Sequence, residues 1–506
     1  MEIEDPDNFE IIESGDEDEE LEQSSGDDSD LDKEETHLTF DKKTGEATDI
    51  TEVYTEMVGG DCEGGGDVQL FEQEEAVGDA FMAVKPWIGA IKEPSEHPDP
   101  DPEKPDEDYA LEYVFGYRAE DSRNNVFYNA DGQVVYMTAC LGVILDKDNN
   151  TQTFFGGNEV ANAAKQHATD KNNHTNDITS IDVSRDGTLA CSGQNGSKPT
   201  VFIWDAITGE KHRRLVLPKG SREVSAIGLS LDNKYVATAD NHNDHHVRVY
   251  DVETGDKLFE QKSGNNKVFD LEWTKKEDHY EFSTCGTKHY MVWRPLEGFG
   301  KKGIYGGKGK QTSHACVAYD ENSTCYSGGS NSRIHVWRNR QLVKTYKVHS
   351  SGFVGAIKVF DGKVFSGGKD GCIIVSDPNS GEAERTIDIG SLPRAIDYKD
   401  DNILVGDRDG KISEINADDE INVLMHSHSE GESWGLDLTS DGKIISSGDD
   451  NKVMVWSIDD HQYLGEGIVS DQNEESEVGK ASSLSKKSAS KCARAVAVNG
   501  AVSIIQ

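Results

Sequence analysis

Four lysines lie close together near the middle of the chain. The stretch 299–310 contains Lys301, Lys302, Lys308 and Lys310, several glycines and no acidic residue. Clustered ammonium groups on a protein that is otherwise negative can bind an acidic surface. The stretch is therefore a candidate partner-binding loop, although a solvated loop without a partner is the commoner role for such a charge run.

Two further basic groups could act in the same way, and both are weaker candidates. The first comprises Lys211, Arg213, Arg214, Lys219 and Arg222. The second comprises Lys486, Lys487 and Lys491 near the end of the chain. Surface charge runs are common, so a solvated loop is again the more frequent role.

Three histidines and an aspartate in residues 241–246 resemble a set of metal ligands. The run falls in an expected turn between two outer strands, where polar residues are usual. A metal site needs ligands that are held by a rigid frame and supported by a second shell of hydrogen bonds. We therefore expect no metal here. His426 and His428 open the last repeat described below, and we expect them to be structural.

Motifs for catalysis are missing from the sequence. It has no glycine-rich phosphate loop, no nucleophile elbow and no distinct pair of carboxylates, so we expect neither an enzyme nor a cofactor. Its eight cysteines stand singly without a Cys-x-x-Cys pair, which favours reduced, buried thiols.

The elements that would position these residues come from a repeat. From residue 174 a short β-rich run recurs seven times, and its fourth positions are 46, 43, 44, 39, 39 and 41 residues apart. These positions are Trp204, Tyr250, Trp293, Trp337, Ser376, Ile415 and Trp456. A period of about 40 residues with four short strands is typical of a WD-repeat β-propeller. The predicted fold class is therefore all-β.

Turns and chain ends refine this prediction. Asp-Gly pairs, such as Asp186-Gly187 and Asp361-Gly362, supply the positive φ that a tight hairpin requires. Residues 134–155 read as three strands of a blade without its innermost strand, and residues 492–498 read as an innermost strand alone. Joining them would close the ring and remove two exposed sheet edges. Whether the ring has seven or eight blades stays open at this point.

A motif precedes the repeats. Residues 111–118, which end in Gly116-Tyr117-Arg118, are followed by Arg123-Asn124 and by the strand-like residues 134–136. This run resembles the hydrophobic (HELP) motif of the echinoderm microtubule-associated protein-like (EMAP-like) family, in which the motif directly precedes WD repeats. The resemblance covers about residues 109–498. It implies association with tubulin or microtubules and a cytoskeletal, often ciliary, setting. We expect Arg118 and Arg123 to make structural bidentate bonds.

This chain departs from the family pattern at its N-terminus. Residues 1–110 hold 38 acidic and 6 basic residues of a chain whose net charge is −44. Many family members bind microtubules through a basic N-terminal region and a coiled coil, whereas here the tail is acidic and shows no heptads. It is predicted to be disordered, because it has little apolar surface to bury. Such a polyanion also disfavours nucleic acid and anionic membranes as partners.

These observations predict the following organisation. Residues 1–80 form the acidic tail, 81–108 an apolar strap and Pro-rich linker, and 109–160 the EMAP-like motif with a partial blade. Residues 174–466 form the propeller from seven WD repeats, and 467–506 form a polar linker with the ring-closing strand. The apolar island 81–91 could instead be a motif for a partner, but a strap that docks on the next domain is favoured.

The functional expectation is a non-catalytic binding platform. It would bind tubulin, microtubules or a microtubule-associated protein, in the cytoplasm, the cytoskeleton and the ciliary axoneme. The alternative is a general WD-repeat scaffold in a soluble assembly without contact to tubulin. A secretion signal and a membrane-spanning segment are not expected, because the first residues lack a basic and an apolar region and the chain has no apolar run of about 18 residues.

Overall fold

The computed structural model describes residues 38–40, 47–49, 110–157, 171–277 and 279–468. In the unit formed by residues 10–108, the strands β1 (Leu38–Phe40) and β2 (Ala47–Asp49) pair antiparallel, with Leu38 opposite Asp49. The rest of the predicted acidic tail, the apolar strap 81–91 and the C-terminal segment 492–498 lie outside the described residues.

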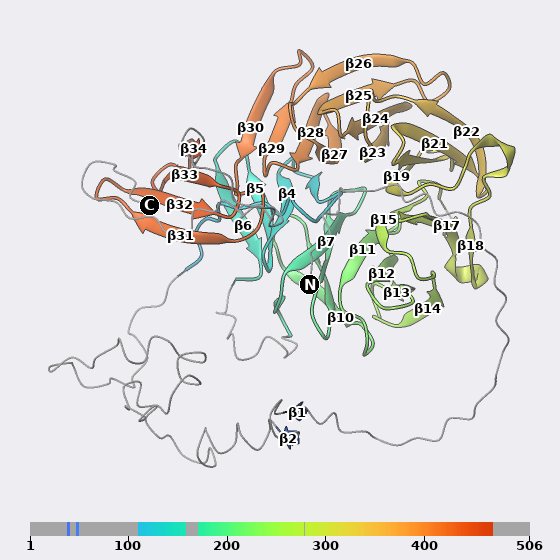
Figure 1. Cartoon of the computed structure of the whole chain (residues 1–506), viewed down its shortest axis with the longest axis horizontal. Coiled ribbons are helices and arrows are strands. Elements are labelled where there is room, and N and C mark those ends of the chain that lie inside the picture. The colour runs from blue at the N-terminus through green and yellow to red at the C-terminus, as the bar shows by residue number, and fades with distance from the viewer. Residues whose placement is uncertain (1–37, 41–46, 50–109, 158–170, 278, 469–506) are drawn as a thin grey trace, which may run out of the picture. The chain divides into compact units, whose positions relative to one another are not determined.

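The described residues from 110 onward form eight four-stranded antiparallel sheets (Figure 1). The first four sheets in chain order have the strands β3 (Val126–Tyr128), β4 (Val134–Thr138), β5 (Leu141–Asp146) and β6 (Thr151–Phe155); β7 (Ile178–Val183), β8 (Leu189–Gln194), β9 (Thr200–Asp205) and β10 (Lys211–Val216); β11 (Val224–Leu229), β12 (Tyr235–Asp240), β13 (His246–Asp251) and β14 (Lys257–Lys262); and β15 (Val268–Trp273), β16 (Phe282–Gly286), β17 (His289–Arg294) and β18 (Phe299–Lys302).

The other four sheets follow the same order. Their strands are β19 (His314–Tyr319), β20 (Cys325–Gly329), β21 (Arg333–Arg338) and β22 (Gln341–Lys347); β23 (Val354–Phe360), β24 (Lys363–Gly368), β25 (Cys372–Ser376) and β26 (Ala383–Asp388); β27 (Pro393–Lys399), β28 (Asn402–Asp407), β29 (Ile412–Ile415) and β30 (Ile421–Met425); and β31 (Ser433–Leu438), β32 (Lys443–Gly448), β33 (Lys452–Ser457) and β34 (Tyr463–Ile468). Two one-turn 3₁₀ helices, η2 (Pro295–Glu297) and η3 (Gly306–Lys308), flank β18.

Seven of these sheets close into a ring. Their innermost strands contact one another in the cycle β3, β7, β11, β15, β19, β23, β27 and back to β3. The sheets pack face to face, so apolar side chains alternate toward both neighbours and most positions of the inner three strands are buried. The predicted all-β propeller is confirmed, and the ring has seven blades.

Aromatic side chains pack between neighbouring sheets of the ring. Trp337 lies against Tyr290 of the preceding sheet, with ring centroids 3.9 Å apart, and its indole N–H donates to Ser327 at 2.8 Å. His314 lies 3.1 Å from the same hydroxyl through its Nδ1. The indole and the hydroxyl are thereby satisfied in a dry seam, where an unpaired polar group would be costly.

Tight turns connect the strands as the Asp-Gly pairs predict. Gly187 has φ 71°, and a Cβ at this position would lie 2.3 Å from the backbone nitrogen of Ala130. Glycine is therefore required here both for its positive φ and for the close approach of the neighbouring sheet. Gly362 also has a positive φ, of 71°.

The eighth sheet, β31–β34, stands beside the ring rather than in it (Figure 1). It packs on the segment that precedes β3. Phe115 lies 4.8 Å from Trp456 between ring centroids, and Tyr113 stacks on His461 at 4.2 Å. The side-chain amide of Asn150 also donates to the backbone oxygen of Asp460 at 2.9 Å.

Two sequence expectations about the blades are corrected. The segment predicted as a partial blade, within residues 109–160, is a complete sheet, because Val126–Tyr128 supplies the innermost strand. This sheet therefore closes the ring without residues 492–498. Of the seven WD repeats predicted to form the propeller, the first six join it, and the seventh is the sheet outside the ring.

Candidate functional site

The EMAP-like motif forms the wall between the first sheet and its neighbours. Tyr117 is buried, and its hydroxyl donates to the side-chain oxygen of Asn125 at 2.7 Å. The Asn125 amide in turn donates to the backbone oxygen of Arg118 at 2.6 Å. Burial raises the pKa of Tyr117, so it stays a neutral hydrogen-bond donor. A Cβ on Gly116 would lie 2.7 Å from the Thr138 hydroxyl, so the motif packs too closely there for a larger residue.

Arg118 makes a bidentate ion pair within the motif. Its Nε and one terminal nitrogen donate to the two carboxylate oxygens of Asp121 at 2.8 and 2.7 Å. The other terminal nitrogen reaches Asp177, just before β7, at 2.9 Å. The hydrogen bonds to Arg118 hold the pKa of Asp121 below its usual value against the opposing effect of burial. Arg118 thus ties the motif to the second sheet of the ring.

Arg123 and Asn124 lie where the innermost strands begin. The Arg123 guanidinium carbon is 5.5 Å from the ring centroid of Phe269 and 5.7 Å from that of Phe353. Phe269 is on β15 and Phe353 directly precedes β23, so Arg123 contacts two other parts of the ring where innermost strands begin. Asn124 has φ 47°, and its N–H donates to the backbone oxygen of Arg394 at 3.0 Å.

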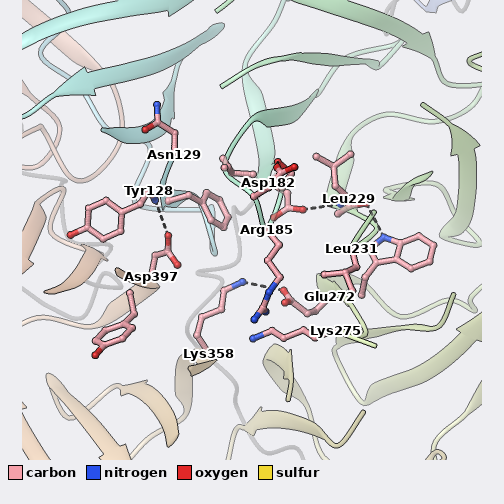
Figure 2. A pocket seen from close by; sticks show the side chains of 18 of the residues that line it. Tyr128, Asn129, Asp182, Arg185, Leu229, Leu231, Glu272, Lys275, Lys358 and Asp397 are labelled. Atoms are coloured by element: carbon pink, nitrogen blue, oxygen red, sulfur yellow. Dashed lines mark hydrogen bonds and ion pairs between the residues drawn. The ribbon is translucent and has the colours of Figure 1, made fainter. Parts of the chain in front are cut away.

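At the opposite end, where the innermost strands finish, the ring holds a cavity of about 350 Å³ (Figure 2). Six of the seven ring sheets contribute to its lining. Lys358 of β23 reaches across the axis to Glu272 of β15, with Nζ 3.0 Å from Oε2. Lys275 also points into the cavity and donates to the backbone oxygen of Val359 at 2.6 Å.

Three aspartates near this cavity join adjacent sheets, and of these Asp270 is buried while Asp182 and Asp397 are half-buried. Asp182, Asp270 and Asp397 each accept a backbone N–H from the innermost strand of the next sheet, at 2.8, 2.9 and 2.7 Å. Burial raises the pKa of Asp182 and of Asp270 to about 7, and it also raises that of Asp397. The negative charge that remains would sit close to Lys358.

The two cavity lysines respond in opposite ways to the same surroundings. For Lys358, burial acts to lower the pKa, but Glu272 and the aspartates outweigh it and the pKa is raised. For Lys275, burial dominates and lowers the pKa to about 8. The chemistry of this arrangement is a compensated charge network across the axis, with acids and ammonium groups balancing one another in a low dielectric.

The predicted basic loop lies at the outer edge of the ring. It is at the opposite side of its sheet from the innermost strand, which borders the ring axis. Lys301 and Lys302 are exposed on β18, the outermost strand of its sheet, and Lys308 and Lys310 are exposed in and after η3. Lys301 also lies 4.8 Å from the ring centroid of Phe299. We call these four lysines the β18 lysine edge.

The second basic group is more engaged and lies elsewhere. Lys211, Arg213 and Arg214 are on β10, the outermost strand of a sheet separated from β15–β18 by β11–β14. Lys211 donates to the side-chain oxygen of Asn172 at 2.6 Å, while Arg213 and Arg214 are half-buried. The structure therefore does not bring the two basic groups together. The third group, 486–491, lies outside the described residues.

The histidine run 241–246 serves the local fold. His245 is buried, with Nδ1 3.0 Å from the backbone oxygen of Asp240, and the His246 N–H donates to the Asp240 side chain at 2.7 Å. Within the described ranges, no group of three or more His, Cys, Asp or Glu side chains is placed to hold a metal ion. His428 lies between Asp450 and the Ser446 hydroxyl, at 2.9 Å from each, and His426 stacks on Tyr463.

The charged residues that line the central cavity were not identified by the sequence analysis. Their signal is nevertheless present. At the fifth residue of an innermost strand, where the neighbouring repeats carry glycine or alanine, Asp182, Glu272, Lys358 and Asp397 are charged. Charged residues at one fixed position of buried strands indicate a shared polar axis.

Comparisons with known proteins agree with this geometry. Residues 172–394 match the echinoderm microtubule-associated protein first β-propeller, residues 104–143 the HELP motif, and residues 420–457 a WD domain, G-beta repeat. No helix among the described residues is long and apolar enough to cross a membrane.

Three curated relatives match over most of the chain. The ciliary WD repeat-containing protein ctxp80 of Euplotoides octocarinatus is 47% identical over 91% of this chain and 63% of its own length. The 77 kDa echinoderm microtubule-associated protein of Strongylocentrotus purpuratus is 27% identical over 72% of this chain and 54% of its own. Echinoderm microtubule-associated protein-like 1 of Homo sapiens is 26% identical over 73% and 46%. The chain thus spans roughly half to two thirds of these relatives, and its HELP motif, first β-propeller and WD repeat confirm the predicted resemblance to the EMAP-like family.

Proposed function

We propose that this chain is a non-catalytic, microtubule-associated platform in the cytoplasm and cytoskeleton, including the ciliary axoneme. The observation that carries the proposal is the match of the HELP motif and the propeller to microtubule-associated proteins, together with the name of the ciliary relative. A propeller suits this role because its rigid sheets hold loops at fixed positions for a partner.

The β18 lysine edge is the surface proposed to meet tubulin or a microtubule-associated partner. Its four ammonium groups are exposed, and the stretch 299–310 carries no acid that would neutralise them. On a chain with a net charge of −44, such a local cationic edge orients the molecule so that this side approaches an acidic surface. The acidic tail opposes that approach and tunes its strength by repulsion.

The test is co-sedimentation of the full chain with microtubules across a salt series. Pelleting is expected to weaken with salt, because exposed charges are screened. Changing Lys301, Lys302, Lys308 and Lys310 to Glu should reduce binding by tenfold or more, since about 1.4 kcal/mol is enough for that factor. The matched control changes four exposed lysines outside the edge to Glu, namely Lys198, Lys276, Lys363 and Lys369.

The control carries the same change of net charge, so it separates local docking from overall repulsion. Equal loss in both variants would leave only non-specific attraction, and unchanged pelleting of the edge variant would remove the edge from the proposal. Absence of pelleting at low salt would favour the second candidate, a WD-repeat scaffold without tubulin contact. The net charge of −44 favours that candidate, because it opposes association with another acidic body.

A further inference from the structure

A smaller cavity, of about 190 Å³, lies between the third and fourth sheets of the ring. Its walls are the loop between β14 and β15, the strand β17 with the turn before it, and the chain that follows β18. That loop leads directly into β15, so the cavity lies at the end of the ring where the innermost strands begin. We call it the Lys288 pocket and define it by the side chains of Asn265, Asn266, Lys288, Lys302 and Gln311.

The Lys288 pocket has two cationic side chains in its lining and no acidic one. Lys288 and Lys302 are both exposed, and no carboxylate of the described residues lies within ion-pair distance of either ammonium group. The central cavity differs in this respect, because there Lys358 pairs with Glu272 at 3.0 Å. The protein therefore leaves two positive charges uncompensated at the Lys288 pocket, and these attract anions from solution.

His289 forms part of the wall and reports where the Lys302 charge lies. It is 5% exposed, and its Nε2 lies 2.8 Å from the Thr284 hydroxyl oxygen. Burial lowers the pKa of His289 to about 4, and the charges of His245 and Lys302 act in the same direction. The wall is thus neutral near pH 7, and the Lys302 ammonium group is close enough to this wall to influence it.

The backbone around the Lys288 pocket is held in place by hydrogen bonds. Lys288 has φ 45°, and its N–H donates to the Ser313 hydroxyl oxygen at 3.0 Å. Its backbone oxygen accepts the Gln311 side-chain amide at 2.7 Å. On the other side, the Gly303 N–H donates to the Tyr290 oxygen at 2.9 Å. A ligand would therefore meet walls that are already ordered, which lowers the cost of binding.

We propose that the Lys288 pocket binds a phosphate group that carries two negative charges, either as free phosphate or as a phosphate monoester on a side chain. The two ammonium groups match the two charges, and the amides of Asn265 and Asn266 offer further N–H donors to the phosphate oxygens. A carboxylate or a phosphodiester carries one charge, so either would leave one ammonium group uncompensated.

This site goes beyond the proposed microtubule role, although the two surfaces meet at Lys302. The β18 lysine edge includes Lys301 and Lys302, whereas the Lys288 pocket is lined by Lys302 and Lys288 but not by Lys301. A bound phosphate would compete with an acidic surface for Lys302. A phosphorylated side chain on a partner would instead add a second, local contact beside the edge.

The experiment follows ³¹P NMR line broadening of small probes on addition of the full chain, at fixed ionic strength and pH 7.5. The probes are inorganic phosphate, N-acetyl-phosphoserine amide and dimethyl phosphate. At this pH the first two are mainly dianions, whereas dimethyl phosphate is a monoanion. We expect the dianions to bind at least about tenfold more tightly than dimethyl phosphate. Tighter binding of the phosphoserine probe would identify a phosphorylated side chain as the source, and equal binding would identify free phosphate.

Variants assign the binding to this pocket. Lys288→Gln and Lys302→Gln should each weaken binding of the dianions about tenfold, because each removes one charge-assisted contact. Asn266→Asp, in an exposed loop, should weaken it further by repulsion, and it keeps the test available if a lysine change disturbs the fold. Lys347→Gln is the matched control, since Lys347 is exposed on the outermost strand β22 and lies outside the lining.

Two outcomes would overturn the proposal. Equal affinity for dimethyl phosphate and the dianions would remove the charge match. Equal weakening by the control and the pocket variants would reduce the binding to general attraction by surface charge. Microtubule pelleting is a separate readout, and Lys288 lies outside the β18 lysine edge, so failure here and failure of the proposed function are distinguishable.

Discussion

The eighth sheet and the ring sheets share a sequence pattern but differ in what covers them. Leu271 on β15 and Leu436 on β31 occupy equivalent positions, since each pairs with the hydroxyl residue that accepts the tryptophan N–H of its sheet. Leu271 is 1% exposed and packs with the preceding sheet, whereas Leu436 is 75% exposed. The same pattern thus gives a core residue in one place and a surface residue in the other.

The comparison teaches that a WD repeat specifies a sheet but not its neighbours. The eighth sheet keeps its internal network, in which Trp456 donates to Ser446 at 2.9 Å and His428 lies 2.9 Å from the same hydroxyl. Among the described residues, no other sheet packs against its innermost strand, and Leu436 and Leu438 are exposed there. Blade packing is therefore a property of the ring.

The largest expected effect is the difference between removing Leu271 and removing Leu436. Leu271→Ala should lower the free energy of unfolding by about 2–5 kcal/mol, because it opens a cavity in a packed seam. Leu436→Ala removes the same atoms from an exposed site and should change it by less than about 0.5 kcal/mol. Denaturant unfolding monitored by far-UV circular dichroism compares the two. Equal losses would show that the two sites are packed alike.

The next prediction tests how the eighth sheet is attached. Phe115→Ala removes the ring that contacts Trp456, so β31–β34 should open more often while the ring stays closed. A loss of about 1–3 kcal/mol would speed amide exchange in β31–β34 roughly tenfold or more, measured by hydrogen exchange and mass spectrometry. Leu464→Ala, at an exposed site on β34, is the matched control. Faster exchange throughout the ring would contradict a local attachment.

The smallest expected effect is a change with pH in the stability of the ring, caused by aspartates near its axis. Asp182 and Asp270 have pKa values of about 7, above the usual range, so the folded chain binds more protons than the unfolded chain between roughly pH 4 and 7. Their contribution to stability is therefore present at low pH and is lost as pH rises toward 8. Relative to the unmodified chain, Asp182→Asn and Asp270→Asn should gain in stability between pH 6 and 8.

The comparison with the Asn variants is necessary because other groups titrate nearby. Burial lowers the pKa of His174 and His289 to about 4, so they stay neutral in the fold and lower its stability as pH falls below about 6.5. Denaturation midpoints at matched pH values, taken as differences between variant and unmodified chain, cancel this contribution. A difference that stays constant from pH 6 to 8 would rule out the raised aspartate pKa values.

Much of the fold was predictable because its signals are local. The spacing of Trp204, Trp293 and Trp337 and the Asp-Gly turns follow from backbone geometry within one repeat. The first sheet was only partly predicted, since its innermost strand has three residues and shows no readable alternation. The candidate site was harder to predict from the sequence, because Lys358 and Glu272 meet across the axis although 86 residues separate them.

The sequence by itself determined the repeated four-stranded unit, its turns and the basic stretch 299–310. Each of these depends on neighbours within about 40 residues, so composition and spacing are enough to indicate them. Only the tertiary structure decided that residues 126–155 close the ring and that the last repeat stands outside it. It also decided that charged residues from several sheets meet in a compensated network at one end of the ring. The physical reason is that closure and burial depend on which surfaces meet, and the pattern of a single repeat does not contain that information.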